Sequence, residues 1–164
     1  MDVEQARTRI AALQATGGNV SDTGELGRLW AALPTVRPES ILGAWKGRGI
    51  TAGHRVEALL TRANWYGKNF HSTDDVEPLI CQDEHGSLFS DSELAKGGAS
   101  LWTVEFRGEA TATMVYDGQP VLDHFKQVSA DTLLGIMNGK NVLDEGRHFY
   151  FLLERTSEQV RSPD

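Results

Sequence analysis

The second half of the chain alternates short apolar segments with turn residues, and this alternation limits the fold more than any other feature. Glycine, asparagine or aspartate lies between the segments, as in Asp117-Gly118 and Asn138-Gly139. A series of short strands with a turn about every eight to twelve residues predicts an up-and-down antiparallel sheet, and closing it into a barrel would remove its exposed edges. The predicted strands cover Val76 to Cys81, Leu101 to Phe106, Ala110 to Tyr116, Val121 to Val128, Thr132 to Met137 and Phe149 to Leu153.

Helical segments are predicted ahead of these strands. In residues 3–13, apolar side chains recur at the spacing of one helix face. Ser21 or Asp22 can cap a second helix, and residues 54–61 read as one short helix after the first strand. We expect a helical segment over residues 1–33 that packs on a barrel formed by residues 34–156. Residues 157–164 would then form a flexible tail.

The composition is that of a single soluble globular domain. Hydrophobic residues make up 40% of the 164 residues and charged residues 24%, so the chain can bury a core of ordinary size. Sixteen Lys and Arg against 23 Asp and Glu give a net charge of −7. This charge repels nucleic acid and anionic membranes, because both require clustered positive charge. We therefore expect neither as a partner, whereas a homodimer remains open.

Cysteine usage and the N-terminal residues bear on the compartment. Cys81 is the single cysteine, so neither an internal disulfide nor a cysteine-rich zinc site can form. The first residues lack the basic start and apolar run of a secretory signal. No apolar stretch approaches the ~20 residues that span a bilayer. We therefore expect a cytoplasmic protein.

Residues 43–47 read Gly-Ala-Trp-Lys-Gly, which places a large aromatic between two glycines. Gly43 and Gly47 would let the first strand bend sharply, and Trp45 would then fill the closed end of a barrel. We therefore interpret these three residues as architectural. The Gly-x-Trp-x-Gly pattern is similar to the first strand of calycin-type barrels, the group of the lipocalins and fatty-acid-binding proteins.

Further segments extend this resemblance from about Leu33 to Arg155. Their order resembles that of the bacterial and fungal GXWXG protein family, whose C-terminal part is known as a domain of unknown function. The resemblance implies a mainly β fold, a small calycin-like antiparallel barrel with helical decoration. It implies no reaction, since the family has no agreed activity. The segments that carry the resemblance are residues 65–70, 75–79, 114–125 and 149–155.

None of the five histidines belongs to an HExxH or His-x-His metal motif, and we expect no metal site. His148 opens the last predicted strand, with Arg155 seven residues on. This layout is similar to the last strand of the haem-binding nitrobindin barrels, in which a histidine at this position ligates haem iron. The resemblance thus implies haem binding through His148. The preceding residues 144–147 read as a solvated turn, which favours a merely polar role.

Asp123 and His124 are neighbours in one predicted strand, so their side chains point to opposite faces of the sheet. Asp123 faces the interior if Phe125 does, and His124 faces it otherwise; the sequence leaves this open. Either choice places an ionisable group among apolar side chains, where it is costly unless paired and its pKa shifts. Such a group suits acid–base chemistry or ligand orientation, or it is simply a carboxylate satisfied by Lys68 or Arg155.

The stretch from Trp65 to Phe70 couples aromatic side chains with a cation. Lys68 could pair with a ligand carboxylate or with Asp75. The aromatic residues, Tyr66 included, could form the wall of a cavity, or they could close the core near a turn.

Binding of a small apolar molecule is the leading hypothesis for function. A calycin-type cavity with a few polar anchors suits a lipid-, polyketide- or terpenoid-like ligand. The alternative is a cofactor-free enzyme of secondary metabolism that catalyses cyclisation, isomerisation or dehydration, with Asp123, His124 or Lys68 as acid or base. No serine-nucleophile elbow, P-loop or dinucleotide fingerprint occurs. The ligand-binding residues expected are Trp65, Tyr66, Lys68, Phe70, Asp123, Phe125, Tyr150 and Arg155.

Overall fold

A computed structural model of the chain describes residues 1–158 and 160. Two helices come first, α1 (Val3–Ala15) and α2 (Thr23–Ala32). Most of the tail expected over residues 157–164 lies outside the described residues. The later elements are, in chain order, η1 (Pro38–Ile41), β1 (Gly43–Gly49), α3 (Val56–Ala63), β2 (Trp65–Phe70), β3 (Val76–Gln82), β4 (Leu88–Ser90), α4 (Ser92–Ala95), β5 (Ala99–Phe106), β6 (Glu109–Tyr116), β7 (Val121–Ser129), β8 (Thr132–Gly139) and β9 (Phe149–Arg155).

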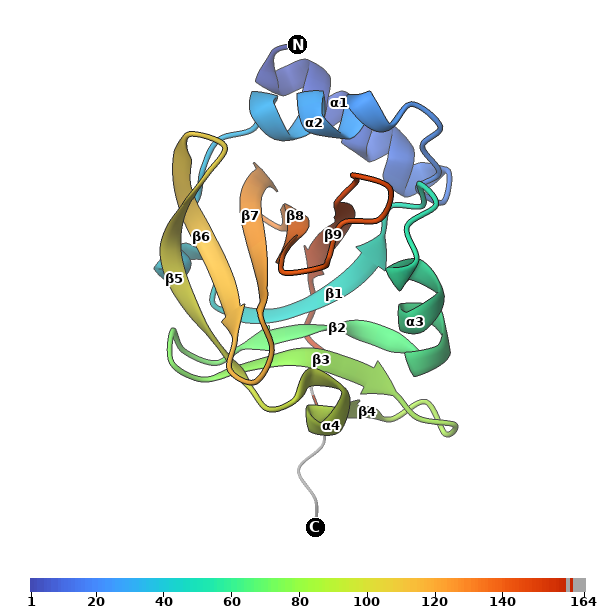
Figure 1. The fold of residues 1–164 in the computed structure, drawn as a ribbon, viewed down its shortest axis with the longest axis vertical. Coiled ribbons are helices and arrows are strands. Elements are labelled where there is room, and N and C mark those ends of the chain that lie inside the picture. Colours follow the sequence, from blue (N-terminus) through green and yellow to red (C-terminus); the bar gives the residue numbers. More distant parts are fainter. Residues whose placement is uncertain (159, 161–164) are drawn as a thin grey trace.

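The strands form one antiparallel sheet that closes on itself, which confirms the predicted barrel (Figure 1). The strand order is β2-β1-β9-β8-β7-β6-β5-β3, and β2 pairs with β3 to complete a ring of eight strands. The ninth strand, β4, extends the sheet beside β3. Each strand from β5 to β8 is paired with the next one in sequence, as an up-and-down sheet requires.

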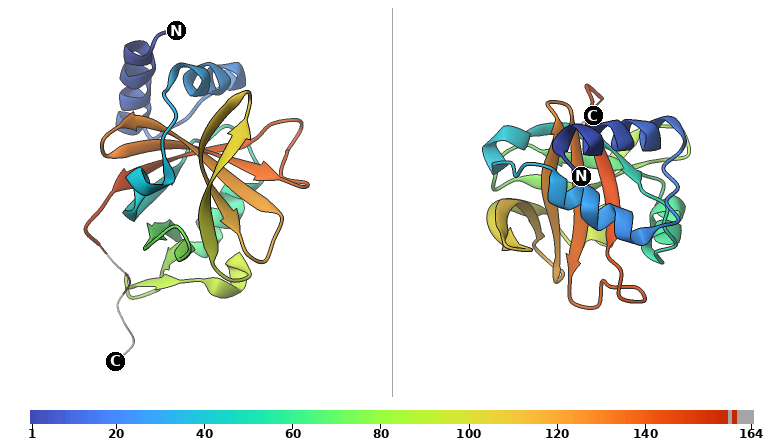
Figure 2. Two further views of the ribbon diagram at one scale, coloured as in Figure 1. Left: turned by 90° about the vertical axis from the view of Figure 1, so that its left-hand side faces the viewer. Right: turned by 90° about the horizontal axis from the view of Figure 1, so that it is seen from above.

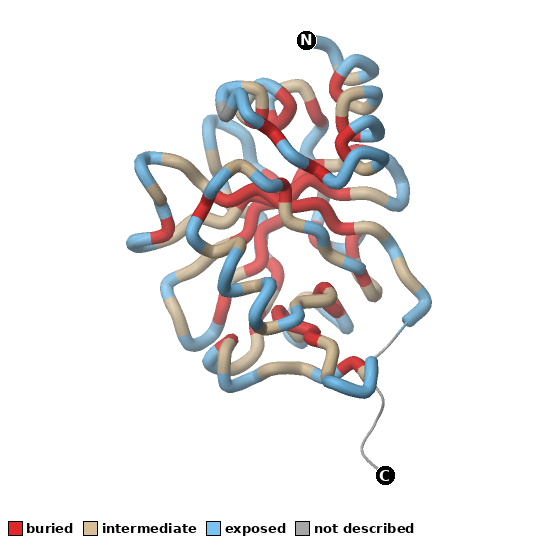
Figure 3. Tube along the Cα trace, turned by 90° about the vertical axis from the view of Figure 1, so that its right-hand side faces the viewer, coloured by how far each residue is buried: buried red, intermediate tan, exposed pale blue. Residues whose placement is uncertain are grey.

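Side chains alternate between the barrel interior and its outer surface along each strand, and each face has its own apolar core. The interior core includes Phe125, Leu133 and Phe151. Leu134 and Leu152, on the opposite face of the same wall, belong to a second core shared with α1 and α2. Figures 1 and 2 show both helices lying across this side of the barrel. The buried stretches in Figure 3 accordingly run through the strands and into the facing sides of the helices.

Trp45 lies in the interior core and is covered by η1. Its indole Nε1 donates a hydrogen bond to the carbonyl of Ile41, at 2.8 Å. The Arg155 guanidinium stacks on the Trp45 ring, 4.3 Å from the centroid, and donates to the carbonyls of Leu42 and Ser40. Together these contacts seal one end of the barrel around Trp45.

The structure adds a strand and three short elements, η1, β4 and α4, to those that the sequence pattern predicts. The strand, β2, is low in strand propensity because it contains Gly67, Lys68 and Asn69, and its pairing with β1 and β3 overrides that propensity. The residues between Ser87 and Ser100 read as a loop but contain β4 and α4. These elements are too short to show a periodic pattern, and α4 is one turn capped by a neighbouring aspartate.

Candidate functional site

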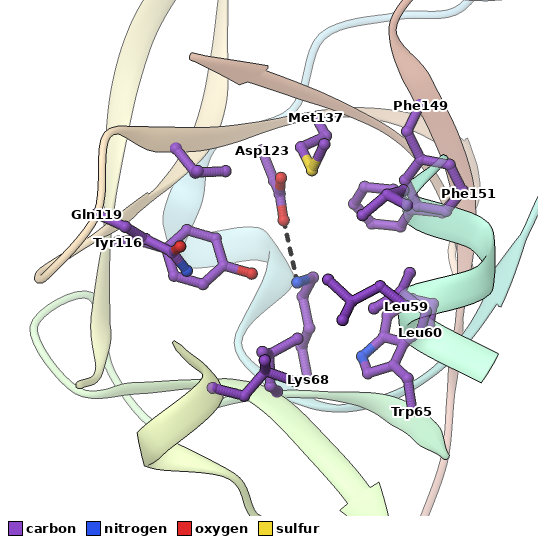
Figure 4. A pocket seen from close by; sticks show the side chains of 14 residues that line it. Leu59, Leu60, Trp65, Lys68, Tyr116, Gln119, Asp123, Met137, Phe149 and Phe151 are labelled. Carbon is purple, nitrogen blue, oxygen red and sulfur yellow. Dashed lines mark ion pairs between the residues drawn. The ribbon is translucent and has the colours of Figure 1, made fainter. Parts of the chain in front are cut away.

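A cavity of about 120 Å³ lies inside the barrel (Figure 4). Residues of α3 form one side of it, and the inward faces of β2, β7, β8 and β9 form most of the rest. Its wall is apolar apart from a lysine, an aspartate, a tyrosine and a glutamine. The lining residues are Val56, Leu59, Leu60, Trp65, Lys68, Leu79, Leu94, Tyr116, Gln119, Val121, Asp123, Met137, Phe149 and Phe151.

Lys68 and Asp123 form an ion pair that faces this cavity. The Lys68 Nζ lies 3.0 Å from the Asp123 Oδ2, and the two side chains are 3% and 4% exposed. The same Nζ donates to the carbonyl of Pro78, at 3.1 Å. Figure 4 shows the pair between Tyr116 on one side and Trp65 on the other. The ammonium therefore has two oxygen partners inside a ring of aromatic side chains.

The aromatic rings around Lys68 partly replace its lost hydration. The Nζ lies 5.4 Å from the ring centroid of Phe151, 5.6 Å from that of Trp65 and 5.7 Å from that of Tyr116. A cation within about 6 Å of an aromatic face is attracted by the ring quadrupole. The three rings therefore attract the Lys68 ammonium in the interior of the barrel.

Burial sets the electrostatics of the other two polar groups. It raises the pKa of Asp123, and the nearby Lys68 ammonium partly opposes that rise. Burial also raises the pKa of Tyr116 well above its ordinary value, with a further contribution from the Asp123 charge. The cavity thus presents an ammonium, a carboxyl group of raised basicity and a neutral phenol close together.

Trp65 is seated on Gly47 of β1. A Cβ atom added at Gly47 would lie 2.2 Å from the Trp65 Cη2, so the absence of a side chain makes room for the indole. The Trp65 ring also meets Phe151 edge to face, with centroids 5.9 Å apart. Gly47 therefore shapes the cavity wall directly, a role that differs from the strand bending we expected of it.

The structure settles which face of β7 points inward. Asp123 and Phe125 face the interior, whereas His124 lies on the outer face beneath the helices. The His124 ring stacks on Phe106, with centroids 4.1 Å apart, and is hydrogen-bonded to Thr113 and Asn138. Burial, followed by the charges of His148 and Arg107, lowers its pKa to about 4. Asp123 and His124 therefore do not act in one site.

His148 lies outside the barrel cavity, at a groove between α2 and the barrel. Its Nδ1 is hydrogen-bonded to the carbonyl of Met137, at 2.9 Å, and its ring meets Phe106 edge-on. Burial lowers the pKa of His148. An axial haem ligand inside the barrel would have to lie on the other face of the strand, so these residues do not fit a haem held in the cavity.

Four other predicted ligand-binding residues do not line the cavity. Phe70 and Phe125 pack against each other in the interior core, with centroids 5.7 Å apart. Tyr66 turns toward Thr156, and its hydroxyl lies 3.3 Å from the Thr156 Oγ1. Tyr150 is on the outer face of β9, where its hydroxyl accepts a hydrogen bond from the Arg107 guanidinium.

Arg155 is the fifth predicted residue away from the cavity, because it covers Trp45 at the sealed end. Sequence reasoning also missed residues that do line the cavity, notably Leu59, Leu60 and Met137. An apolar residue gives no signal in the sequence that separates a cavity wall from a packed core. The pattern of β6 could have found Tyr116, since it shares the inward face with Met114.

The described residues give little support for a metal site or for a cysteine nucleophile. Within them, no group of three or more His, Cys, Asp or Glu is arranged to hold a metal ion. Burial raises the pKa of Cys81 to about 11, so its thiol is protonated and weakly nucleophilic at neutral pH. No helix in residues 1–158 is both long and apolar enough to cross a membrane.

Comparisons with known proteins identify relatives along most of the chain. The family described as "GXWXG protein" matches residues 28–86, and the family described as "Domain of unknown function (DUF4334)" matches residues 97–155. A crystal structure of a protein from Thermomonospora curvata is 37% identical, with a TM-score of 0.84. The match covers 93% of this chain and 99% of that one. No curated protein matches significantly.

Proposed function

The chain belongs to the GXWXG protein family. We propose that it binds a small, largely apolar molecule inside its barrel. The observation that carries the proposal is the buried Lys68–Asp123 ion pair, which faces an otherwise apolar cavity. Removing two charges from water is expensive, and apolar side chains of similar size would often be at least as stable. Perturbed ionisable groups in a cavity are therefore candidates for a functional site.

The size of the cavity limits the part of the ligand that it encloses. An engineered apolar cavity of about 150 Å³ holds one benzene molecule, and the cavity here has about 120 Å³. The enclosed part of the ligand is therefore no larger than a single ring or a short branched chain. A carbonyl or hydroxyl on it would meet the ion pair. Lys68 can donate a hydrogen bond to such a group, and Asp123 can accept one.

The tryptophans offer a direct test of this proposal. We would titrate the protein with benzyl alcohol and follow the indole N–H signals by heteronuclear NMR. The Trp65 signal should shift saturably, whereas the signal of Trp102, whose side chain is exposed on the outer surface, should not. Equal shifts of both signals, or none, would contradict binding in the cavity.

A pair of matched variants sharpens this test. Leu60→Phe adds volume at the cavity wall, and Leu143→Phe makes the same change at an exposed position outside the cavity lining. We expect Leu60→Phe to weaken benzyl alcohol binding at least fivefold because it occupies the space of the ligand. Leu143→Phe should bind as the unmodified protein does. Unchanged affinity in Leu60→Phe would place the ligand elsewhere.

The second candidate function is acid–base catalysis without a cofactor. It is favoured by the raised pKa of Asp123 beside Lys68 in a site largely closed to water. Asp123 would remove a proton from the carbon next to a carbonyl, and Lys68 would donate a hydrogen bond to the enolate oxygen that forms. Where the ligand has a carbon–carbon double bond conjugated with that enolate, return of the proton at the far carbon of the double bond completes an isomerisation.

Hydrogen exchange of a simple ketone separates the two candidates. With cyclohexanone in D2O, an enzyme should accelerate deuterium incorporation next to the carbonyl, and Asp123→Asn should abolish the acceleration. A carrier should bind cyclohexanone and leave the exchange rate at that of buffer. Acceleration that persists in Asp123→Asn would remove Asp123 as the base.

A further inference from the structure

The cavity continues into a wider groove at the barrel surface. This outer groove has a volume of about 480 Å³ and shares five lining residues with the cavity. Its edges come from α3, from the end of α4, from the turn between β6 and β7, and from the loop between β8 and β9. These elements surround the side of the barrel that faces the viewer in Figure 1. The shared residues are Val56, Leu59, Gln119, Val121 and Met137.

The outer groove is basic although the protein as a whole is acidic. Arg55, Arg62, Lys96 and Lys140 line it, and its lining contains no Asp or Glu among the described residues. The complete chain carries a net charge of −7. Four cations around one opening are therefore a local reversal of the overall charge, and such a reversal attracts anions to the opening.

Three of these four cations are not paired with a carboxylate among residues 1–158. Arg55 is engaged, because it donates to the carbonyls of Leu143 and Asn141 and lies 3.7 Å from Asp144. The other three are exposed, and none forms an ion pair within residues 1–158. We call these three the basic rim: Arg62, Lys96 and Lys140.

The ion pair inside the barrel explains why an anion would bind at the rim and not deeper. Lys68 is already neutralised by Asp123 at 3.0 Å. A ligand carboxylate placed beside Lys68 would lie next to the carboxylate of Asp123 in a poorly solvated site, where repulsion between like charges is strong. We therefore expect the part of the ligand inside the barrel to be neutral and its anionic group to lie at the opening.

We propose that the ligand is an anionic amphiphile, with a ring or short apolar chain in the cavity and a carboxylate or phosphate held by the basic rim. This inference rests on the proposed function, since it assigns the two parts of the molecule that the cavity binds. The apolar part gains from burial. The anion gains from the charge of Arg62, Lys96 and Lys140 in a groove that is only partly open to water.

Three probes with one skeleton test the inference. They are 4-phenylbutyrate, 4-phenylbutanamide and 4-phenylbutylamine, which share a phenyl ring and a three-carbon chain and differ in the charge of the head group. Affinity is measured by calorimetry, and the Trp65 indole signal reports entry into the cavity. We expect the carboxylate to bind about fivefold more tightly than the amide, because exposed charge pairs each contribute modestly. The amine should bind most weakly, and 0.5 M salt should erase the order.

Two variants of equal charge identify the groups responsible. Arg62→Gln/Lys96→Gln removes two cations from the rim. Arg37→Gln/Lys46→Gln removes two exposed cations that line neither the cavity nor the outer groove. The rim variant should weaken carboxylate binding about threefold and leave amide binding within about twofold. The control should change neither affinity beyond that range. An anionic phosphate probe, 3-phenylpropyl phosphate, should follow the carboxylate.

The outcomes separate this inference from the proposed function. If all three phenyl probes bind equally and shift Trp65, and the rim variant changes nothing, the charge preference is wrong and the cavity function stands. If none of the probes binds or shifts Trp65, the proposed function fails and the inference fails with it. A carboxylate preference that survives in the rim variant would assign the anion to other residues.

Discussion

Two buried lysines, each paired with a carboxylate, lie on opposite faces of the barrel wall. Lys68 faces the interior with Asp123 at 3.0 Å, and Lys126 faces the helices with Glu109 at 2.5 Å. Each ammonium also donates to a backbone carbonyl and lies within 6 Å of an aromatic ring. The chemistry of the two pairs is the same, and their surroundings differ.

The difference lies in where each carboxylate can be solvated. The side chain of Glu109 is 45% exposed, whereas that of Asp123 is 4% exposed and lines the cavity. The outer pair therefore reaches bulk water and ties β7 to the end of α2 through the carbonyl of Trp30. The inner pair faces only the cavity, so a molecule bound there is what it can contact. The same kind of ion pair, a lysine with a carboxylate, thus forms a structural contact on one face and part of a candidate ligand site on the other.

The largest expected effect comes from breaking the inner pair. Lys68→Met leaves the Asp123 carboxylate without its cation in an apolar site, and the free energy of unfolding should fall by about 3–5 kcal/mol at pH 7. Urea denaturation measures this. In Lys68→Met/Asp123→Leu most of the loss should be recovered, because two apolar side chains need no partner. A loss below about 1 kcal/mol in the single variant would be too small for a buried pair.

The outer face should control the response to acid. The pKa of His124 falls from 6.5 to about 4 on folding, so the folded state favours the neutral ring. Its contribution is fully present above pH 6.5 and is lost as the pH falls toward 4, a change of roughly 3 kcal/mol. Unfolding free energies measured across this range should fall steeply, and His124→Gln should flatten the slope. An unchanged slope would mean that other groups dominate.

The contact of the Trp65 indole with Gly47 predicts an intermediate loss of stability when Gly47 is replaced. Gly47→Ala places a Cβ against the indole, and the resulting overpacking should cost about 1–3 kcal/mol of unfolding free energy. Gly27→Ala is the control, since its Cβ meets nothing within 4 Å in α2 and should stabilise the helix by about 0.5–1 kcal/mol. Thermal denaturation compares the two. Adding Trp65→Leu should relieve Gly47→Ala, and failure to do so would contradict the steric explanation.

The smallest effect should come from breaking the outer pair. Lys126→Met frees Glu109 to become hydrated and removes one hydrogen bond to a carbonyl, for a loss of about 1–2 kcal/mol. Binding of 4-phenylbutyrate should stay within about twofold of the unmodified protein, as measured by calorimetry. A larger loss of affinity in Lys126→Met would mean that the outer face also shapes the cavity, and the contrast between the two pairs would no longer hold.

Much of the fold follows from local patterns. The strands from β5 to β9 carry turn residues in their gaps, and α1 and α2 carry apolar residues at helical spacing. By contrast, β2 is a strand because β1 and β3 provide its hydrogen bonds on both sides. A sequence pattern predicts a helix or strand when the side chains of that segment favour it. It misses a strand such as β2, which depends on hydrogen bonds to neighbouring strands.

The residues of the candidate site were likewise only partly predictable from the sequence. Asp123 and Lys68 stood out in the sequence as ionisable residues within predicted apolar surroundings, and the resemblance around Trp45 indicated a barrel. Which face of β7 turns inward depends on how the sheet closes, because both faces of β7 pack against an apolar core and the apolar pattern alone does not distinguish them. Barrel closure therefore decided that Asp123 meets Lys68, 55 positions away in sequence, and that His124 and Arg155 lie elsewhere.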